Sequence, residues 1–144
     1  MPAFESVQYA RLKEILNPLA DKFNSEEFIV SDPISIPHLY SKKQDIEIAG
    51  LFSAIISWGN RKSIINNATK LMELMDNEPY EFILHHKEHE RKHLQGFVHR
   101  TFQDTDLIFL VDFLQRYYLH NISLEDAFYL DKNIPYTQKE ALSG

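Results

Sequence analysis

The chain has 144 residues, 44% of them hydrophobic and 25% charged, and it holds only four glycines and six prolines, a composition that favours a single helical domain over a turn-rich β architecture. It contains no cysteine, which excludes disulfides, thiolate nucleophiles and cysteine-ligated metal sites and indicates a cytoplasmic protein. No run of about 18 apolar residues occurs, so no membrane span is expected, and the net charge of −6 means that any nucleic-acid binding depends on a local basic patch.

The first predicted element is an amphipathic helix over residues 6–23. Its apolar residues recur at helical spacing, and Pro18 is expected to kink or split it because proline lacks the N–H group that an interior helical position needs. A loop follows this helix. Residues 31–40, SDPISIPHLY, then place two prolines among β-branched residues and predict an extended, ordered connection.

A central helix is predicted over residues 42–57. Ser41 and Gln44 have the spacing of a capping box, in which both side chains bond to free backbone N–H groups at a helix start. Apolar residues then cover most of the helix circumference, which predicts the most buried helix of the fold. Gly59 suits the left-handed residue that ends a helix, and Asn60 suits the cap of a second helix, residues 61–76, so that the two form an αα-hairpin.

The second half of the chain predicts three more helices. A short helix over residues 79–86 begins with proline, which is favoured at a first helical position. Asp104 or Thr105 can cap a longer helix over residues 105–120. Ser123 is expected to open another short helix.

The end of the sequence carries a further helix start signal. Thr137 and Glu140 form another capping box, and the sequence stops at Gly144 with about one helical turn available. We therefore expect residues 1–144 to form one helical domain that is the amino-terminal part of a longer domain.

Residues 89–99, HERKHLQGFVH, match the zinc-binding signature H-E-x-x-H-x-x-G-x-x-H of metzincin proteases. That signature needs a helix seated on a core, which presents two histidines to zinc and a glutamate to water. Here Arg91 and Lys92 fill the spacer positions, the helix is nearly polar all round, and no methionine lies downstream for the turn that metzincins require. We therefore expect a solvated polar helix and no metal site, and zinc-dependent proteolysis is only the third hypothesis.

Residues 57–62, SWGNRK, hold the main candidate binding site. Arg61 and Lys62 occupy the first turn of a predicted helix, where the positive end of the helix dipole disfavours cations. A helix start with free N–H groups, two cations and the neighbouring Trp58 indole predicts a phosphate-binding position with a stacking surface. The alternative is purely structural: Trp58 closes the core, Asn60 is only a cap, and Arg61 pairs with an acid elsewhere.

Residues 96–102, GFVHRTF, form a second cluster. Phe97 and Phe102 are expected in the core, with the cationic side chains of His99 and Arg100 facing outward. Arg100 is then a candidate clamp on a nucleic-acid backbone, and the alternative is again a structural role.

Four stretches together resemble an uncharacterised bacterial family of proteins of unknown function. They are DPISIPH, DIEIAG, WGNR and HRTF, which here span residues 32–38, 45–50, 58–61 and 99–102. Members of that family look longer than this chain, and their remaining half looks like the helix-hairpin-helix DNA glycosylase superfamily. The resemblance implies a glycosylase-like helical fold whose catalytic half is absent from this chain. The Trp58-Gly59-Asn60 loop departs from the glutamine-containing segment of those enzymes.

The sequence therefore predicts an all-α, single-domain helical bundle. The leading functional hypothesis is nucleic-acid contact in a DNA glycosylase-like protein, through Trp58, Asn60, Arg61, Lys62 and Arg100. The rival hypothesis is a non-enzymatic helical interaction module that forms a homo-oligomer through exposed apolar surface. Neither hypothesis requires a cofactor, and the sequence identifies no catalytic residue.

Overall fold

The computed structural model describes residues 2–128, with side chains from residue 8 onward. It is mostly helical, which confirms the all-α prediction, and the described part of the chain forms a single two-stranded sheet. No helix in this part is long and apolar enough to cross a membrane. The capping-box pair Thr137 and Glu140 lies outside the described residues.

In chain order the elements are α1 (Pro2–Phe23), α2 (Glu26–Val30), η1 (Pro33–Ser35), η2 (Pro37–Leu39), α3 (Lys43–Ile55), α4 (Arg61–Leu74), α5 (Pro79–His85), η3 (Glu90–Leu94), β1 (Val98–His99), β2 (Phe102–Gln103), α6 (Asp104–Tyr118) and η4 (Leu124–Phe128).

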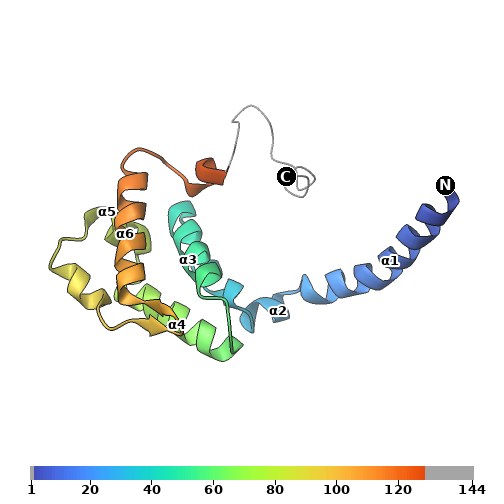
Figure 1. The fold of residues 1–144 in the computed structure, drawn as a ribbon, viewed down its shortest axis with the longest axis horizontal. Coiled ribbons are helices and arrows are strands. Elements are labelled where there is room, and N and C mark those ends of the chain that lie inside the picture. The colour runs from blue at the N-terminus through green and yellow to red at the C-terminus, as the bar shows by residue number, and fades with distance from the viewer. Residues whose placement is uncertain (1, 129–144) are drawn as a thin grey trace.

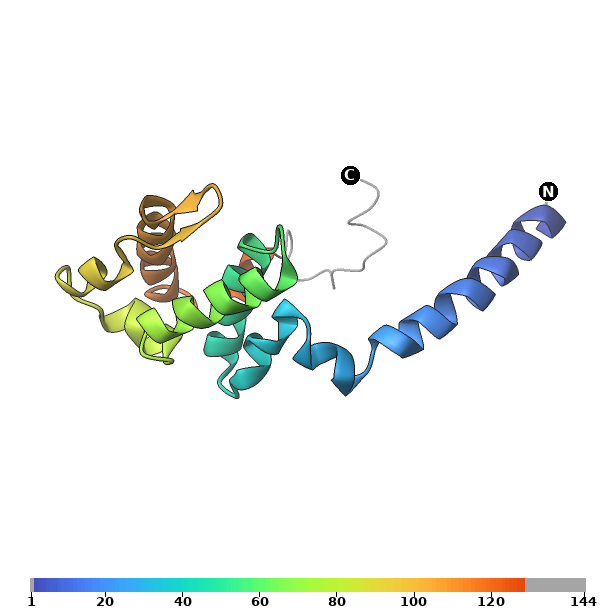
Figure 2. The ribbon, with the colours of Figure 1, turned by 90° about the horizontal axis from the view of Figure 1, so that it is seen from below.

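Helix α1 projects from the body of the molecule as an arm (Figure 1; Figure 2). The arm is one continuous helix with Pro18 inside it, so of the two predicted effects of this proline, a kink or a split, the split does not occur. Its apolar side chains face solvent, and Leu12, Leu16 and Leu19 are 53%, 55% and 44% exposed. The arm is therefore not stabilised by packing against the body, although packing normally supplies most of the stability of a helix.

The core lies among helices α3, α4, α5 and α6 (Figure 1). Helix α3 contacts α4, α5 and both short 3-10 helices of segment 33–39. It is the helix with the most neighbours, as a central helix should be, but the apolar Ile46 is 39% exposed and Ala54 is also exposed, so one side of it faces outward. The fully buried side chains at the centre of the core are Ile48, Phe52, Leu71, Met72, Ile83, Leu107, Val111 and Leu114.

The connection before α3 is helical rather than extended. Residues 26–30 form α2, which was not predicted, and the two prolines of SDPISIPHLY each begin a 3-10 helix. A proline at the first position of a helix keeps its preferred φ and gives up only an N–H group that has no partner there. Asp32 supports this turn, because its Oδ1 accepts a hydrogen bond from the Ile34 amide at 3.1 Å.

The caps of two helices also differ from the prediction. Lys42, and not Ser41, precedes α3, and no side chain caps its first turn. The Gln44 amide donates instead to the carbonyl oxygen of Ile122 at 3.0 Å, which ties the start of α3 to the segment after α6. At the start of α6 the capping residue is Gln103, whose backbone N–H group donates to the Asp106 carboxylate at 2.9 Å.

Candidate functional site

Residues 56–60 form the loop between α3 and α4. Gly59 has a φ of 111°, so the left-handed conformation predicted for it is confirmed, although it lies within the loop and not directly at the end of α3. The Asn60 side-chain oxygen accepts a hydrogen bond from the Ser63 amide at 3.3 Å, which confirms the predicted cap of α4. The two helices therefore form an αα-hairpin. The loop that joins them leads into the first turn of α4, whose backbone N–H groups have no partner within the helix.

A β-hairpin that was not predicted contacts this loop. His99 pairs with Phe102, which leaves Arg100 and Thr101 as a two-residue turn. Arg100 has a φ of 54°, a conformation that is costly for a residue with a side chain. Its guanidinium group lies directly on Gly59, because a Cβ atom added to Gly59 would come within 2.3 Å of the Arg100 Nε. The position of Arg100 therefore depends on the missing side chain of Gly59.

His99 links the β-hairpin to both helices of the αα-hairpin. Its side chain is buried, at 3% exposure, so the expectation that it faces outward is wrong. The Asn67 Nδ2 atom on α4 donates to His99 Nδ1 at 2.8 Å, and His99 Nε2 donates to the Trp58 carbonyl oxygen at 3.2 Å. These two bonds fit a neutral imidazole with its proton on Nε2. The Trp58 indole also meets the imidazole edge-on, with ring centroids 5.8 Å apart.

The two cations at the start of α4 have different surroundings. The Arg61 Nη2 atom lies 3.7 Å from the Asp32 Oδ2 atom, and the guanidinium group lies 5.7 Å from the centroid of the Phe28 ring. Arg61 therefore has the acidic partner that the structural alternative expected, while 57% of its side chain stays exposed. Lys62 is exposed and forms no ion pair with any residue from 8 to 128.

The structure thus brings the five candidate residues to one corner of the body but gives them unequal roles. Asn60 caps α4, and Arg61 already pairs with Asp32. Trp58 is 39% exposed beside the turn that carries Arg100, and both remain accessible together with Lys62. We call residues 56–62 together with residues 99–101 the Gly59 corner.

Asn67 and the structural role of His99 were missed from the sequence. Asn67 lies seven residues after Asn60, so both fall on about the same side of α4, and a second polar residue at that spacing was an available signal. The burial of His99 could be read only from the alternation of side chains in a hairpin. Two strands of two residues each are too short to give that alternation a clear pattern.

Residues 32–143 match the model of a protein family described as "Protein of unknown function (DUF2400)". The chain belongs to this family. The match confirms the resemblance to an uncharacterised family, and the similarity to DNA glycosylases stays a prediction. The comparisons with curated proteins and with solved structures return no match. The DUF2400 match begins at Asp32, so it contains the whole Gly59 corner and leaves out helices α1 and α2.

The metzincin-like segment of this DUF2400 chain does not form the predicted polar α-helix. Glu90–Leu94 is a 3-10 helix, and Leu94 is fully buried in the core. The Glu90 carboxylate accepts a hydrogen bond from the Lys87 amide at 2.6 Å, which holds the pKa of Glu90 below its ordinary value. A general base needs a pKa near the working pH, so this carboxylate is shifted in the wrong direction. Among the residues that the structure describes, no three His, Asp or Glu side chains could hold a metal ion.

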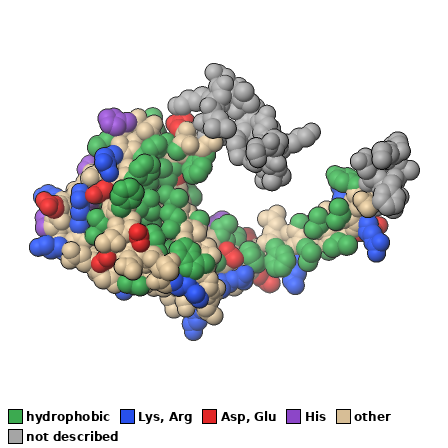
Figure 3. Space-filling model, viewed as in Figure 1, with side chains coloured by type: hydrophobic (Ala, Val, Ile, Leu, Met, Phe, Trp, Pro, Cys, Tyr) green, Lys and Arg blue, Asp and Glu red, His purple; other side chains and the backbone are tan. Residues whose placement is uncertain are grey.

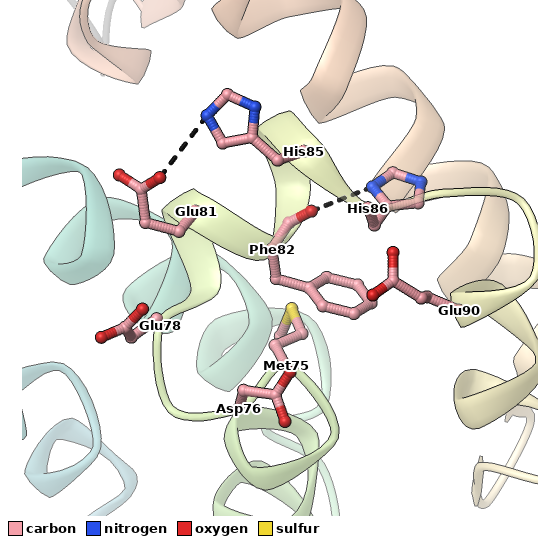
Figure 4. Close-up of a pocket in the computed structure, with 8 residues that line it drawn as sticks. All are labelled: Met75, Asp76, Glu78, Glu81, Phe82, His85, His86 and Glu90. Carbon is pink, nitrogen blue, oxygen red and sulfur yellow. Dashed lines mark hydrogen bonds and ion pairs between the residues drawn. The ribbon is translucent and has the colours of Figure 1, made fainter.

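A cavity of 160 Å³ between the end of α4 and α5 gathers further acids and histidines (Figure 4). His85 points toward Glu81, with its Nε2 atom 3.5 Å from the carboxylate. His86 points the other way and is buried, with its Nδ1 atom 3.0 Å from the Phe82 carbonyl oxygen. Its Nε2 atom accepts a hydrogen bond from Arg91 at 3.2 Å. Because the two histidines diverge and each has its own partner, this cavity offers no converging set of catalytic groups.

Proposed function

We propose that the Gly59 corner contacts the phosphate backbone of a nucleic acid. The observation that carries this proposal is the position of Arg100, whose guanidinium group lies on Gly59 beside the start of α4. Phosphate oxygens are recognised by guanidinium N–H groups and by the free backbone N–H groups of a helix start. The exposed Lys62 adds a second cation on the first turn of that helix.

The arrangement of Arg100 also supports the proposal. An arginine normally loses rotamer freedom when it binds a ligand, and that loss weakens binding. Here the turn that carries Arg100 is already restricted by two contacts: the loop of residues 56–60, on which the Arg100 side chain lies, and the buried neighbouring residue His99. Arg100 also keeps a positive φ where glycine would be unstrained, and strained residues of this kind cluster at functional sites.

Trp58 indicates which form of nucleic acid suits the corner. Its indole is 39% exposed and is held edge-on against His99. An exposed aromatic ring beside cations is a stacking surface for an unpaired base, whereas a closed duplex keeps its bases stacked on each other. We therefore propose single-stranded or flipped-out nucleotides as the substrate class.

Replacing Lys62 or Arg100 with alanine is expected to weaken binding of a single-stranded oligonucleotide. Each lost phosphate contact should reduce the slope of log affinity against log salt by about 0.7 to 1. Fluorescence anisotropy at several salt concentrations measures both quantities. Lys70→Ala, which removes a cation from the far end of α4, serves as the matched control and should leave the slope unchanged. Equal slopes in all three variants and the parent chain would reject the Gly59 corner as the contact.

The DNA glycosylase-like role of the whole protein is a further proposal. It is supported by the family resemblance of the four sequence stretches and by the helical fold, which is an argument by analogy. In this proposal the chain supplies DNA contact, and the residues that cleave the glycosidic bond are outside it.

Self-association is the second candidate function, and the exposed arm favours it. Tyr9, Leu12, Leu16, Leu19 and Phe23 are spaced alternately by three and four residues, the repeat of a coiled-coil seam, and each is at least 44% exposed. Hydrophobic side chains line the arm and also gather on the face of the body shown in Figure 3. A helix of this kind is only marginally stable in water without a partner surface.

A coiled-coil contact between arms would make the apparent mass depend on concentration. Sedimentation velocity over a hundredfold dilution is expected to show a dimer that dissociates. Leu16→Glu places a charge in the seam and should yield a monomer at every concentration, whereas Asn17→Glu, one residue outside the seam, should not. A parent chain that stays monomeric throughout would remove this candidate.

A further inference from the structure

A groove lies between segment 32–40 and the outward side of α3. It consists of two adjoining cavities of 230 Å³ and 450 Å³, and both are lined by Ile34, Pro37 and Gly50. The smaller cavity also reaches three polar side chains, those of Asp32, Ser53 and Ser57. The larger one continues toward Tyr40 and Ile46. We call the two together the α3 groove, and its size is that of a small-molecule site.

Ser53 is the feature that distinguishes this groove from an ordinary surface hollow. Its side chain lines the smaller cavity and is only 4% exposed, yet its Oγ atom has no hydrogen-bond partner among the described residues. A buried hydroxyl group without a partner is destabilising and rare in native proteins. The Oγ atom itself is enclosed in the free protein, so a molecule bound in the cavity satisfies it after the Ser53 side chain rotates toward the cavity.

The polar end of the groove offers mainly acceptors and negative charge. One oxygen of Asp32 bonds to the Ile34 amide, and the other faces Arg61 only at 3.7 Å. The Ser57 hydroxyl donates to the Ser53 carbonyl oxygen at 2.5 Å, which leaves its own lone pairs free to accept. The carbonyl groups at the end of α3 add partial negative charge. A ligand group that donates hydrogen bonds and carries positive charge fits this end, where it competes with Arg61 for Asp32.

The apolar part of the groove has room because residue 50 is a glycine. A Cβ atom added to Gly50 would have Pro37 Cβ as its nearest neighbour, at 3.9 Å, which is an ordinary contact. The space above Gly50 is therefore open, and it connects the polar end to the side chains of Tyr40 and Ile46.

We propose that the α3 groove binds a small primary amine with an apolar body. Its ammonium group bonds to Asp32, Ser53 and Ser57, and its body crosses Gly50 toward Tyr40 and Ile46. The groove shares Ser57 with the Gly59 corner, and its Asp32 pairs with Arg61 of that corner. The proposal still does not depend on the nucleic-acid contact, because that contact rests on Arg100 and Lys62 and takes a ligand of opposite charge.

The test titrates the chain with 2-phenylethylamine and follows backbone amides by two-dimensional NMR. The neutral 2-phenylethanol and the anionic 3-phenylpropanoate have a similar apolar body and serve as matched ligands. We expect saturable shifts at amides of segment 32–40 and α3 with the amine, and at least about tenfold weaker binding of the other two, since a charge-assisted hydrogen bond is lost. Absence of saturable shifts with the amine, or equal binding of all three ligands, would overturn the proposal.

Three variants locate the site. Gly50→Leu fills the groove while favouring the helix, and it should weaken amine binding by at least about tenfold. Asp32→Asn keeps the oxygen that bonds to Ile34 but loses the charge, and Ser53→Ala removes the buried hydroxyl; each should weaken binding by about three- to tenfold. Ser53→Ala should also leave the melting temperature unchanged or higher, because no hydrogen bond of the free protein is lost.

Ser25→Ala, on the segment before α2, is the control and should bind as the parent does. Circular dichroism verifies that each variant is folded. If Gly50→Leu does not fold, the affinities of Ser53→Ala and Asp32→Asn for the amine still test the proposed site. Unchanged affinity in both of these variants contradicts the proposed site.

Discussion

Gly59→Ala is expected to displace Arg100 and to lower the free energy of unfolding by about 1–3 kcal/mol. The backbone at this position has a φ of 111°, which side-chain-bearing residues rarely adopt. The new Cβ atom would also lie 2.3 Å from Nε and 2.6 Å from Nη2 of Arg100. Because the guanidinium group ends a flexible side chain, it moves aside, and the backbone strain remains. Urea denaturation measures the loss of stability.

The same substitution should reduce oligonucleotide affinity if the proposed contact is right, and by less than Arg100→Ala does, because the displaced guanidinium group keeps its charge. Gly96→Ala is the matched control, because Gly96 also has a positive φ, 79°, but no atom lies within 4 Å of an added Cβ. It should cost a similar amount of stability and leave nucleic-acid binding unchanged. Equal losses of binding in the two variants would show that the effect comes from stability and not from Arg100.

The parts of the Gly59 corner that depend on neighbours in sequence could be predicted. The Asn60 cap and the left-handed Gly59 each follow from the chemistry of one residue and its nearest backbone groups. The parts that depend on distant residues could not. Residue 99 is 32 positions from Asn67 and 41 from Trp58, and no local pattern in the sequence links these three residues.

Two prolines caused an error in the predicted fold for a related reason, and a third did not split its helix. A proline restricts φ and removes a donor, but these properties are compatible with the first turn of a 3-10 helix as well as with an extended chain. In segment 31–40 the side chain of Asp32 bonds to the Ile34 amide and stabilises the turn. At Pro18 the continuous helix shows that one missing hydrogen bond does not end a helix of this length.

Glu47 is the site of the largest expected loss of stability. Its carboxylate is 14% exposed and accepts hydrogen bonds from the Tyr118 hydroxyl at 3.0 Å, from the Leu124 amide at 2.9 Å and from the Ser123 hydroxyl. It thereby joins α3 to the end of α6 and to η4. No local sequence pattern indicates this contact, since its donors lie more than 70 residues away.

Glu47→Ala is expected to lower the free energy of unfolding by about 3–5 kcal/mol, because it leaves three partly buried donors without a charged acceptor. Urea denaturation measures the change, and Glu47→Gln, which keeps an acceptor of similar shape, should lose less. Glu81→Ala is the control, since Glu81 is about half exposed and its partners Lys42 and His85 also lie on the surface, so its loss should change stability little.

The ionisation of Tyr118 gives a second readout for the same variant. Burial, together with the hydrogen bond and the charge of Glu47, raises the pKa of the Tyr118 phenol far above its ordinary value. Removing Glu47 should lower the pKa of Tyr118, yet leave it above the ordinary value, because the burial remains. A Glu47→Ala variant that unfolds at the same urea concentration as Glu81→Ala would show that the hydrogen bonds of Glu47 contribute little to holding α3, α6 and η4 together.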